Sequence, residues 1–200
     1  MNSIDQFRDQ VANVGPDQFV ARLLDYIKEK GQSRYDESVT QIEHALQCAQ
    51  LAKNAQLPAT AVTAALLHDL GHLLLDEHDS QEGFLAEDLN HEEIGAKFLT
   101  DFFPPVVTEP IRLHVAAKRY LCSTDKEYYD KLSEASKRSF AVQGGNLSAE
   151  EQSEFEKNEH LNLATKIRRL DDQAKKKGLP VPDIEEFASQ IAESLQRGSV

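Results

Sequence analysis

The chain has 200 residues and a formal net charge of −12, with 28% charged and 7% aromatic residues. This length is enough to bury a sizeable core, and we expect a single domain over residues 1–200. The acidic balance argues against a nucleic-acid groove and against binding to an anionic membrane surface. No apolar run approaches membrane-spanning length, and the first residues do not form a signal peptide. Cys48 and Cys122 are too few for a disulfide framework and lack zinc-site spacing, so we expect a cytoplasmic globular protein.

Apolar residues in the first half of the chain recur at helical spacing, and no strand pattern is convincing. Residues 4–30 predict one or two amphipathic helices, and residues 40–56 predict another. Residues 60–70 predict a buried helix that Gly71 closes. Residues 76–93 contain eight acidic residues and no lysine or arginine, and we expect most of them to form a solvated loop.

The second half of the chain continues the helical pattern. Predicted helices cover residues 91–103, 108–121, 128–142, 160–177 and 183–197. Ser148 and Glu151 have the spacing of a capping box, and Asp183 is a candidate N-cap. The expected fold class is therefore all-α.

The stretch from Ala64 to His72 has the sequence AALLHDLGH and places His68 beside Asp69. Adjacent side chains on a helix point roughly 100° apart, so the two could bind two metal ions, or one ion from a bent helix end. Imidazole and carboxylate ligands suit iron, manganese or zinc. The alternative is a helix that simply ends in polar residues at Gly71. We favour a metal site because other helices supply further ligands.

Six residues on separate helices or helix ends have metal-ligand chemistry. They are His44, His68, Asp69, His91, His114 and Asp171. Four imidazoles and two carboxylates suit a pair of iron-like ions better than a single ion, with Asp69 as the bridging carboxylate.

A second group of residues supplies hydrogen-bond donors. It comprises Lys118, Ser136, Ser139, Gln143 and Arg168. Such a set fits an oxyanion, above all a phosphoryl or phosphonyl group. Lys118 is four residues after His114 and shares its helix face. The alternatives are that Lys118 is a surface lysine and that Arg168 forms an intrahelical ion pair with Asp171, which if exposed would be worth only a few tenths of a kcal/mol.

The order His…His-Asp…Asp resembles that of the HD-domain superfamily, and the two extra histidines resemble its dinuclear branch. Five stretches are similar to the PhnZ-type phosphonate oxygenases, which are iron-dependent enzymes that cleave carbon–phosphorus bonds. These stretches are QIEHALQCA, AALLHDLGH, HVAAKRYL, LSEASKRSF followed by QGG, and KIRRLD. The resemblance covers most of residues 37–172, and a broader one extends to myo-inositol oxygenase. It implies an HD-domain helical bundle with its core over 37–177, on which the N-terminal helices (4–30) and the C-terminal helix (183–197) pack.

The resemblance also implies an activity. A mixed-valent Fe(II)/Fe(III) pair held by the six ligands would use O2 to cleave a (1R)-1-hydroxy-2-aminoethylphosphonate-type substrate into a carboxylate and phosphate. His68, Asp69, Tyr35 and Glu37 would be catalytic. The phosphonate would be bound by His72, Lys118, Ser136, Ser139, Gln143 and Arg168. The 1-hydroxyl would come from a 2-oxoglutarate-dependent hydroxylase, with no contact between the two proteins implied.

The segment before His44 is expected to recognise the end of the substrate that is remote from phosphorus. The family has a Tyr-x-x-Glu segment near the substrate amine and the dioxygen-binding iron. Glu37 matches the glutamate, but Arg34 occupies the tyrosine position and Tyr35 is shifted by one. Tyr35, Asp36 and Glu37 offer an aromatic face and carboxylates, which suit a quaternary ammonium through cation–π attraction. We therefore favour the N-trimethylated substrate, with glycine betaine as product, over the primary amine, which would give glycine.

Two other functions compete with this interpretation. An HD phosphohydrolase would cleave a nucleotide or phosphate ester with a metal-activated water and would not need O2. His91, His114 and the HVAAKRYL stretch argue against it. A non-catalytic ligand-binding HD domain is the other alternative, and the complete ligand set argues against that.

Overall fold

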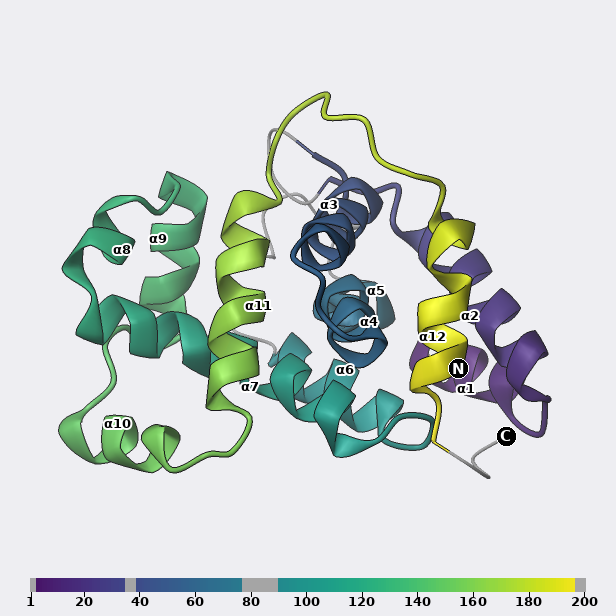
Figure 1. Cartoon of the computed structure of the whole chain (residues 1–200), viewed down its shortest axis with the longest axis horizontal. Helices are drawn as coiled ribbons and strands as arrows, with labels where there is room; N and C mark the ends of the chain where they lie inside the picture. Colours follow the sequence, from purple (N-terminus) through teal and green to yellow (C-terminus); the bar gives the residue numbers. More distant parts are fainter. Residues whose placement is uncertain (1–2, 35–38, 77–89, 197–200) are drawn as a thin grey trace.

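In the part of the chain that the structure describes, nearly all regular structure is helical (Figure 1). The computed structural model describes residues 3–34, 39–76 and 90–196. Within these ranges there is no strand, only an isolated bridge between Arg34 and Thr40. The all-α prediction is confirmed. The first six helices are α1 (Ser3–Val11), α2 (Pro16–Lys30), α3 (Gln41–Asn54), α4 (Ala59–Leu67), α5 (Leu70–Leu74) and α6 (His91–Leu99). The remaining elements are α7 (Pro105–Thr124), α8 (Lys126–Asp130), α9 (Glu134–Val142), α10 (Ala149–Glu156), α11 (Leu161–Gln173), the 3-10 helix η3 (Ile184–Phe187) and α12 (Ala188–Ser194).

Helices α3, α4 and α5 occupy the middle of the molecule (Figure 1). The α3 helix begins at a capping box in which Thr40 accepts from the backbone N–H of Glu43 and the Glu43 side chain accepts in return. The α4 sequence, ATAVTAALL, is almost wholly apolar, and every residue from Ala61 to Leu67 is buried. A helix that is apolar on all sides needs neighbours all round it, and α4 packs against α3, α7, α11 and α12.

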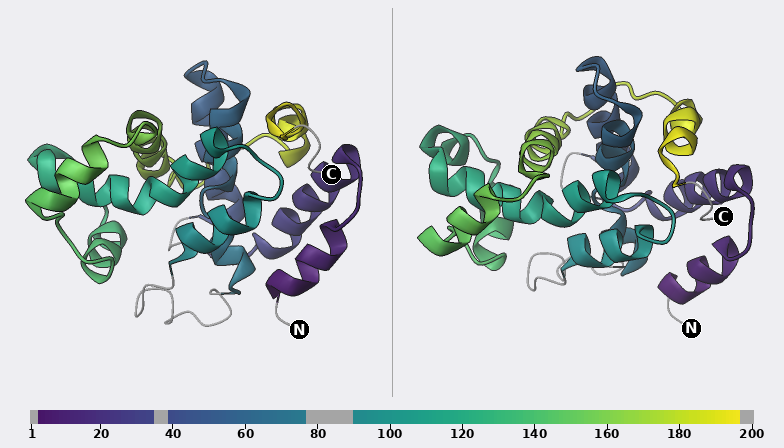
Figure 2. Two further views of the ribbon diagram at one scale, coloured as in Figure 1. Left: turned by 90° about the horizontal axis from the view of Figure 1, so that it is seen from below. Right: turned by 60° about the horizontal axis from the view of Figure 1, so that its bottom comes forward.

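The remaining helices lie on two sides of this centre. Helices α1, α2 and α12 lie on one side, and α8, α9 and α10 lie on the other, beyond α7 and α11 (Figures 1 and 2). The first group shares the main apolar core with α3 to α7. The second group has smaller apolar clusters of its own, one of them around Tyr128 and Phe140. Among the helices in the described ranges, none is long and apolar enough to cross a membrane.

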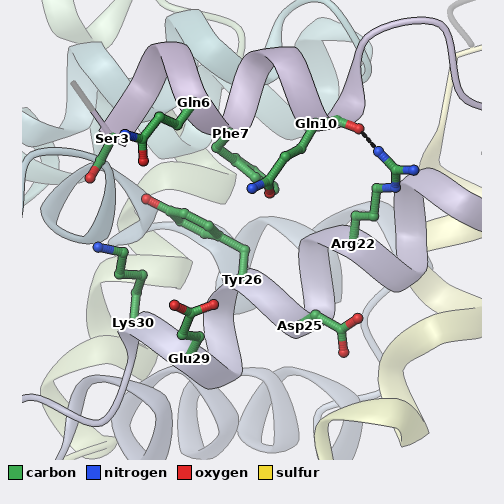
Figure 3. Close-up of a pocket in the computed structure, with 9 residues that line it drawn as sticks. All are labelled: Ser3, Gln6, Phe7, Gln10, Arg22, Asp25, Tyr26, Glu29 and Lys30. Carbon is green, nitrogen blue, oxygen red and sulfur yellow. Dashed lines mark hydrogen bonds between the residues drawn. The ribbon is translucent and has the colours of Figure 1, made fainter. Parts of the chain in front are cut away.

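A surface groove lies between α1 and α2 (Figure 3), and none of the residues predicted for the site lines it. At this groove the Tyr26 ring stacks on Phe7, with 4.0 Å between the ring centroids. The Tyr26 hydroxyl donates to the Leu73 carbonyl oxygen over 3.0 Å. The N-terminal helices therefore hold the end of α5, the short helix that follows Asp69.

The predicted helix over 60–70 is wrong at its C-terminal end. Helix α4 ends at Leu67 and α5 begins at Leu70, so His68 and Asp69 lie in the break between two helices. Gly71 lies within α5 and does not close a helix. A Cβ atom on Gly71 would lie 1.9 Å from the His91 carbonyl oxygen, so glycine is needed for the close approach of α5 to α6.

Other predicted boundaries also need correction. Residues 128–142 form two helices, because Ser133 caps a new helix by accepting from the Ser136 N–H. The helix expected over 160–177 ends at Gln173. Residues 183–197 contain η3 and α12 in place of one helix, and Asp183 makes no side-chain cap. The predicted capping box at Ser148 is confirmed.

Candidate metal centre and anion pocket

The break between α4 and α5 places Asp69 at the centre of a buried cluster of imidazoles. Among the described residues, two groups of side chains each have ligand atoms that all lie within 4.8 Å of one another. One group is His44, His68 and Asp69, and the other is Asp69, His91 and His114. All five residues are buried, and Asp69 belongs to both groups.

The two oxygens of Asp69 face different pairs of histidines. Its Oδ2 lies 3.4 Å from Nε2 of His44 and 3.2 Å from Nε2 of His68. Its Oδ1 lies 3.6 Å from Nε2 of His91 and 3.5 Å from Nε2 of His114. Within each pair the two Nε2 atoms are 3.2 Å apart. One carboxylate oxygen directed at each imidazole pair is the arrangement that a carboxylate bridge between two cations requires.

Asp171, on α11, faces only the first pair. Its Oδ1 lies 3.3 Å from His44 Nε2, and its Oδ2 lies 3.9 Å from His68 Nε2. Asp69 Oδ2 is buried and has no hydrogen-bond partner within the described residues. A buried oxygen without such a partner is costly, and a bound cation removes that cost. The residues therefore fit a metal site.

Backbone carbonyls orient three of the four imidazoles. The Nδ1 atoms of His44, His68 and His114 lie within hydrogen-bond distance of carbonyl oxygens. The acceptors and distances are Ala174 at 2.7 Å, Ala65 at 2.9 Å and Ile111 at 2.7 Å, respectively. A proton on Nδ1 leaves the Nε2 lone pair available to a metal ion. The Nδ1 atom of His91 instead lies 3.5 Å from the carboxylate of its neighbour Glu92.

Electrostatics keep Asp69 charged and His72 neutral. Burial alone would raise the pKa of Asp69, but the surrounding imidazoles, His68 first, hold it well below its ordinary value. His72 stacks on His91, with ring centroids 3.7 Å apart and an interplanar angle of 18°. Burial lowers the pKa of His72 to about 4. At neutral pH its imidazole is therefore uncharged beside the second histidine pair.

The donor residues predicted for an oxyanion lie in and beside α7, α9 and α11. The Lys118 ammonium donates to Ser139 Oγ over 2.6 Å and to Gln143 Oε1 over 2.8 Å. Only 2% of Lys118 is exposed, so the interpretation as a surface lysine is wrong. Ser136 is also buried and sits one turn before Ser139. Together these side chains form a polar cluster beside His114, which shares α7 with Lys118, and we call this candidate site the anion pocket.

Arg168 is buried and engages two carboxylates on its own helix. Its Nη1 lies 2.5 Å from Asp171 Oδ2, and its Nη2 contacts Asp172. The intrahelical ion pair between Arg168 and Asp171, considered as the alternative, is present, but both residues are buried and the pair is not exposed. The Tyr128 hydroxyl accepts from Arg168 Nε over 3.2 Å and donates to Asp172 over 2.5 Å.

Sequence reasoning missed Asp172, Tyr128 and Lys175 around this pocket. The Lys175 ammonium lies 3.3 Å from Asp171 Oδ1 and 3.2 Å from Ser136 Oγ. A spacing of four residues from Arg168 to Asp172, and from Asp171 to Lys175, was the available signal. Tyr128 had no such signal, because its partners are 40 and 44 residues away.

The segment expected to recognise the amine, Tyr35, Asp36 and Glu37, lies outside the described residues. Its role stays a prediction.

Anion binding in the pocket should depend on the charge of Lys118. Burial, reinforced by the Arg168 guanidinium, lowers the pKa of Lys118 to about 7. Only the ammonium form attracts an anion, so the dissociation constant for sulfate, which does not titrate here, should rise about tenfold per pH unit above pH 7. Isothermal titration calorimetry on metal-loaded protein measures this. A Lys118→Arg variant should stay flat to pH 9, and a decline parallel to the wild type would assign the effect to another group.

Comparisons with known proteins agree with this geometry. The HD domain model matches residues 42–139. The hydroxymethylphosphonate dioxygenase of Gimesia maris is 52% identical over 181 residues, 90% of each chain. The glycine-betaine-forming [1-hydroxy-2-(trimethylamino)ethyl]phosphonate dioxygenase of Leisingera caerulea is 40% identical over 185 residues, again 90% of each chain. An uncharacterized protein of Acanthamoeba polyphaga mimivirus is 33% identical over 91% of this chain and 84% of its own. With a buried His/Asp cluster that can hold metal and with relatives of this similarity, the chain belongs to the HD-domain phosphonate dioxygenases.

Proposed function

We propose that this protein is an iron-dependent dioxygenase that cleaves the C–P bond of a 1-hydroxyalkylphosphonate to give a carboxylate and phosphate. The observation that carries the proposal is the shared carboxylate of Asp69 between two histidine pairs, with the buried cations Lys118 and Arg168 nearby. The relatives named as phosphonate dioxygenases support the same chemistry. A phosphohydrolase or a non-catalytic binding domain would leave these relatives unexplained.

The metal in this proposal is a pair of iron ions in the Fe(II)/Fe(III) state. His44, His68 and Asp171 would hold one ion, His91 and His114 the other, and Asp69 both. Zinc fits such ligands as well, but it has no redox chemistry with which to activate O2. Bound iron would supply the electrons that activate O2 for oxidation of the carbon next to phosphorus.

The protein's own side chains would bind and orient the phosphonate. Lys118 and Arg168 would bind its oxygens by charge-assisted hydrogen bonds, while Ser136 and Ser139 would complete the contacts. When the C–P bond breaks, negative charge develops on the departing phosphate, and the same fixed cations stabilise it without reorganising. His72 would remain neutral beside the anion, because burial lowers its pKa to about 4.

The atom balance defines the products. Hydroxymethylphosphonate and one O2 contain the atoms of formate and phosphate, whereas the 2-trimethylammonio compound and one O2 contain those of glycine betaine and phosphate. The 52% identity to the hydroxymethylphosphonate enzyme favours the smaller substrate. Tyr35, Asp36 and Glu37 favour the trimethylammonium compound, as does the relative at 40% identity. We place hydroxymethylphosphonate first and the trimethylammonium substrate second.

A time course of product release tests both parts of the proposal. Iron-loaded protein is incubated with each of three phosphonates, hydroxymethyl, 1-hydroxy-2-(trimethylammonio)ethyl and 1-hydroxy-2-aminoethyl, with and without O2. We expect phosphate only with O2, in a 1:1 ratio with formate, and slower release from the two larger compounds. Faster formation of glycine betaine or glycine would reverse the substrate order and leave the mechanism intact. Phosphate release from an ester without O2, and none from any phosphonate with it, would refute the dioxygenase.

The substrate chemistry indicates which reaction must come before this one, and the cysteines indicate the cell compartment. The 1-hydroxyl of the larger substrates must be installed first, a reaction suited to a 2-oxoglutarate-dependent hydroxylase that need not contact this protein. Cys48 and Cys122 are both free and buried, which suits a reducing cytoplasm.

A further inference from the structure

A turn after α11, formed by Ala174, Lys175 and Lys176, connects the histidine cluster with the anion pocket. The Ala174 carbonyl accepts from His44 Nδ1 over 2.7 Å and so orients a candidate metal ligand. Gln47, buried on α3, forms hydrogen bonds with both backbone polar groups of Lys176. Its Nε2 donates to the Lys176 carbonyl over 2.9 Å, and its Oε1 accepts from the Lys176 N–H over 3.0 Å. Because α3 and α11 pack together (Figure 1), this turn is fixed in place.

Lys175 is the residue that this turn directs inward. Its ammonium lies 3.2 Å from Ser136 Oγ and 3.3 Å from Asp171 Oδ1, and only 14% of its side chain is exposed. One cation therefore contacts both a pocket serine and a candidate metal ligand. The next residue, Lys176, has the same charge but is exposed. Two adjacent lysines of equal charge thus differ in the exposure of their side chains.

The charges around the anion pocket are compatible with a third cation that contacts the bound anion. Arg168 is already paired with both Asp171 and Asp172, whereas the groups contacting Lys118 are the neutral side chains of Ser139 and Gln143. When Asp171 binds a cation, its charge is neutralised there and less of it remains to hold Lys175. The Lys175 ammonium then faces Ser136, the Asp172 carboxylate 3.9 Å away and an incoming dianion.

We propose that Lys175 is a third cationic contact for the phosphonate substrate and the phosphate product, and that Gln47 is a positioning residue for it. This inference rests on the proposed function, because it assigns the anion pocket to those ligands. With Lys118 and Arg168, Lys175 provides one cation for each of the three phosphonate oxygens, a match that a carboxylate ligand with two oxygens does not offer.

The test compares Lys175→Met with Lys176→Met, which removes the same charge from the adjacent residue. Binding of inorganic phosphate to the iron-loaded protein without O2 is measured by isothermal titration calorimetry, and the iron content of each variant is determined. We expect Lys175→Met to weaken phosphate binding about 10- to 100-fold, as for loss of one charge-assisted hydrogen bond. Lys176→Met should change it less than about twofold, since exposed charges are strongly screened. Lys175→Arg should recover part of the affinity for phosphate. In the Lys175→Met variant, KM for the phosphonate should rise by a larger factor than kcat falls.

Gln47 is tested by a double-mutant cycle. Gln47→Leu should weaken phosphate binding through Lys175, so Gln47→Leu with Lys175→Met should bind no more weakly than Lys175→Met alone. Additive losses would show that Gln47 acts elsewhere and would remove its positioning role.

Two results would overturn the role of Lys175. One is equal phosphate affinity in the Lys175→Met and Lys176→Met variants. The other is a Lys175→Met protein that loses iron yet binds phosphate normally once fully loaded, because Lys175 would then act only on Asp171. Failure of the proposed function is a separate outcome, namely no O2-dependent phosphate release by the wild type, and the comparison of phosphate binding still decides the place of Lys175.

Discussion

Replacing Asp69 with alanine should remove both metal ions and abolish C–P cleavage. Each oxygen of this carboxylate faces its own histidine pair, with distances of 3.2 to 3.6 Å to the four Nε2 atoms. Without this carboxylate, the four buried imidazoles have one fewer anion beside them to balance the charge of two metal ions. We expect iron to fall from two ions per chain to almost none after desalting, and phosphate release to fall on the order of 1,000-fold or more. Metal analysis and the O2-dependent phosphate assay measure the two effects.

A His44→Ala variant separates loss of the bridge from loss of one ligand. His44 faces only the first group, so this variant should keep the ion held by His91 and His114 and retain about one iron per chain. Asp101→Ala, which removes an exposed carboxylate, should retain both ions. Circular dichroism establishes that each variant is folded. Two irons in a folded Asp69→Ala protein would rule out the bridging role.

Sequence reasoning succeeded where the signal was local. The pairing of His68 with Asp69, the apolar helix before them and the shared face of His114 and Lys118 all depend on residues within a few turns of one another. The structure brings His44 next to His68 and Asp69. The spacing of these residues in the sequence could not show that they meet. The resemblance to a known family supplied that long-range information.

The features that the sequence did not predict depend on tertiary contacts. The apolar periodicity predicted one helix over residues 60–70, which includes Asp69. In the structure a separate short helix begins at Leu70, and it brings Gly71 close to His91. Lys175 belonged to a helix predicted to run through residue 177, and only the turn after Gln173 directs it to Ser136. The contacts of Gln47 with that turn span 129 residues, beyond any pattern in a local window.

Replacing Gly71 with alanine should selectively damage the half of the site that contains His91. A Cβ atom at position 71 would lie 1.9 Å from the His91 carbonyl oxygen and 2.6 Å from its carbonyl carbon. These are backbone atoms at the start of α6, so relief requires α5 and α6 to move apart. Overpacking of this kind typically lowers the free energy of unfolding by about 1–3 kcal/mol. A displacement of about 1 Å at His91 should also lower the rate of phosphate release about 100-fold.

The expected pattern distinguishes this variant from one that is merely unstable. Gly71→Ala should keep the ion bound by His44 and His68 and lose the ion bound by His91, giving about one iron per chain in folded protein at low temperature. Gly15→Ala is the matched control, because a Cβ there meets nothing within 4 Å. It should retain two irons, full activity and nearly unchanged resistance to urea. If Gly71→Ala also kept both irons and full activity, the close approach of α5 to α6 would not be what positions His91.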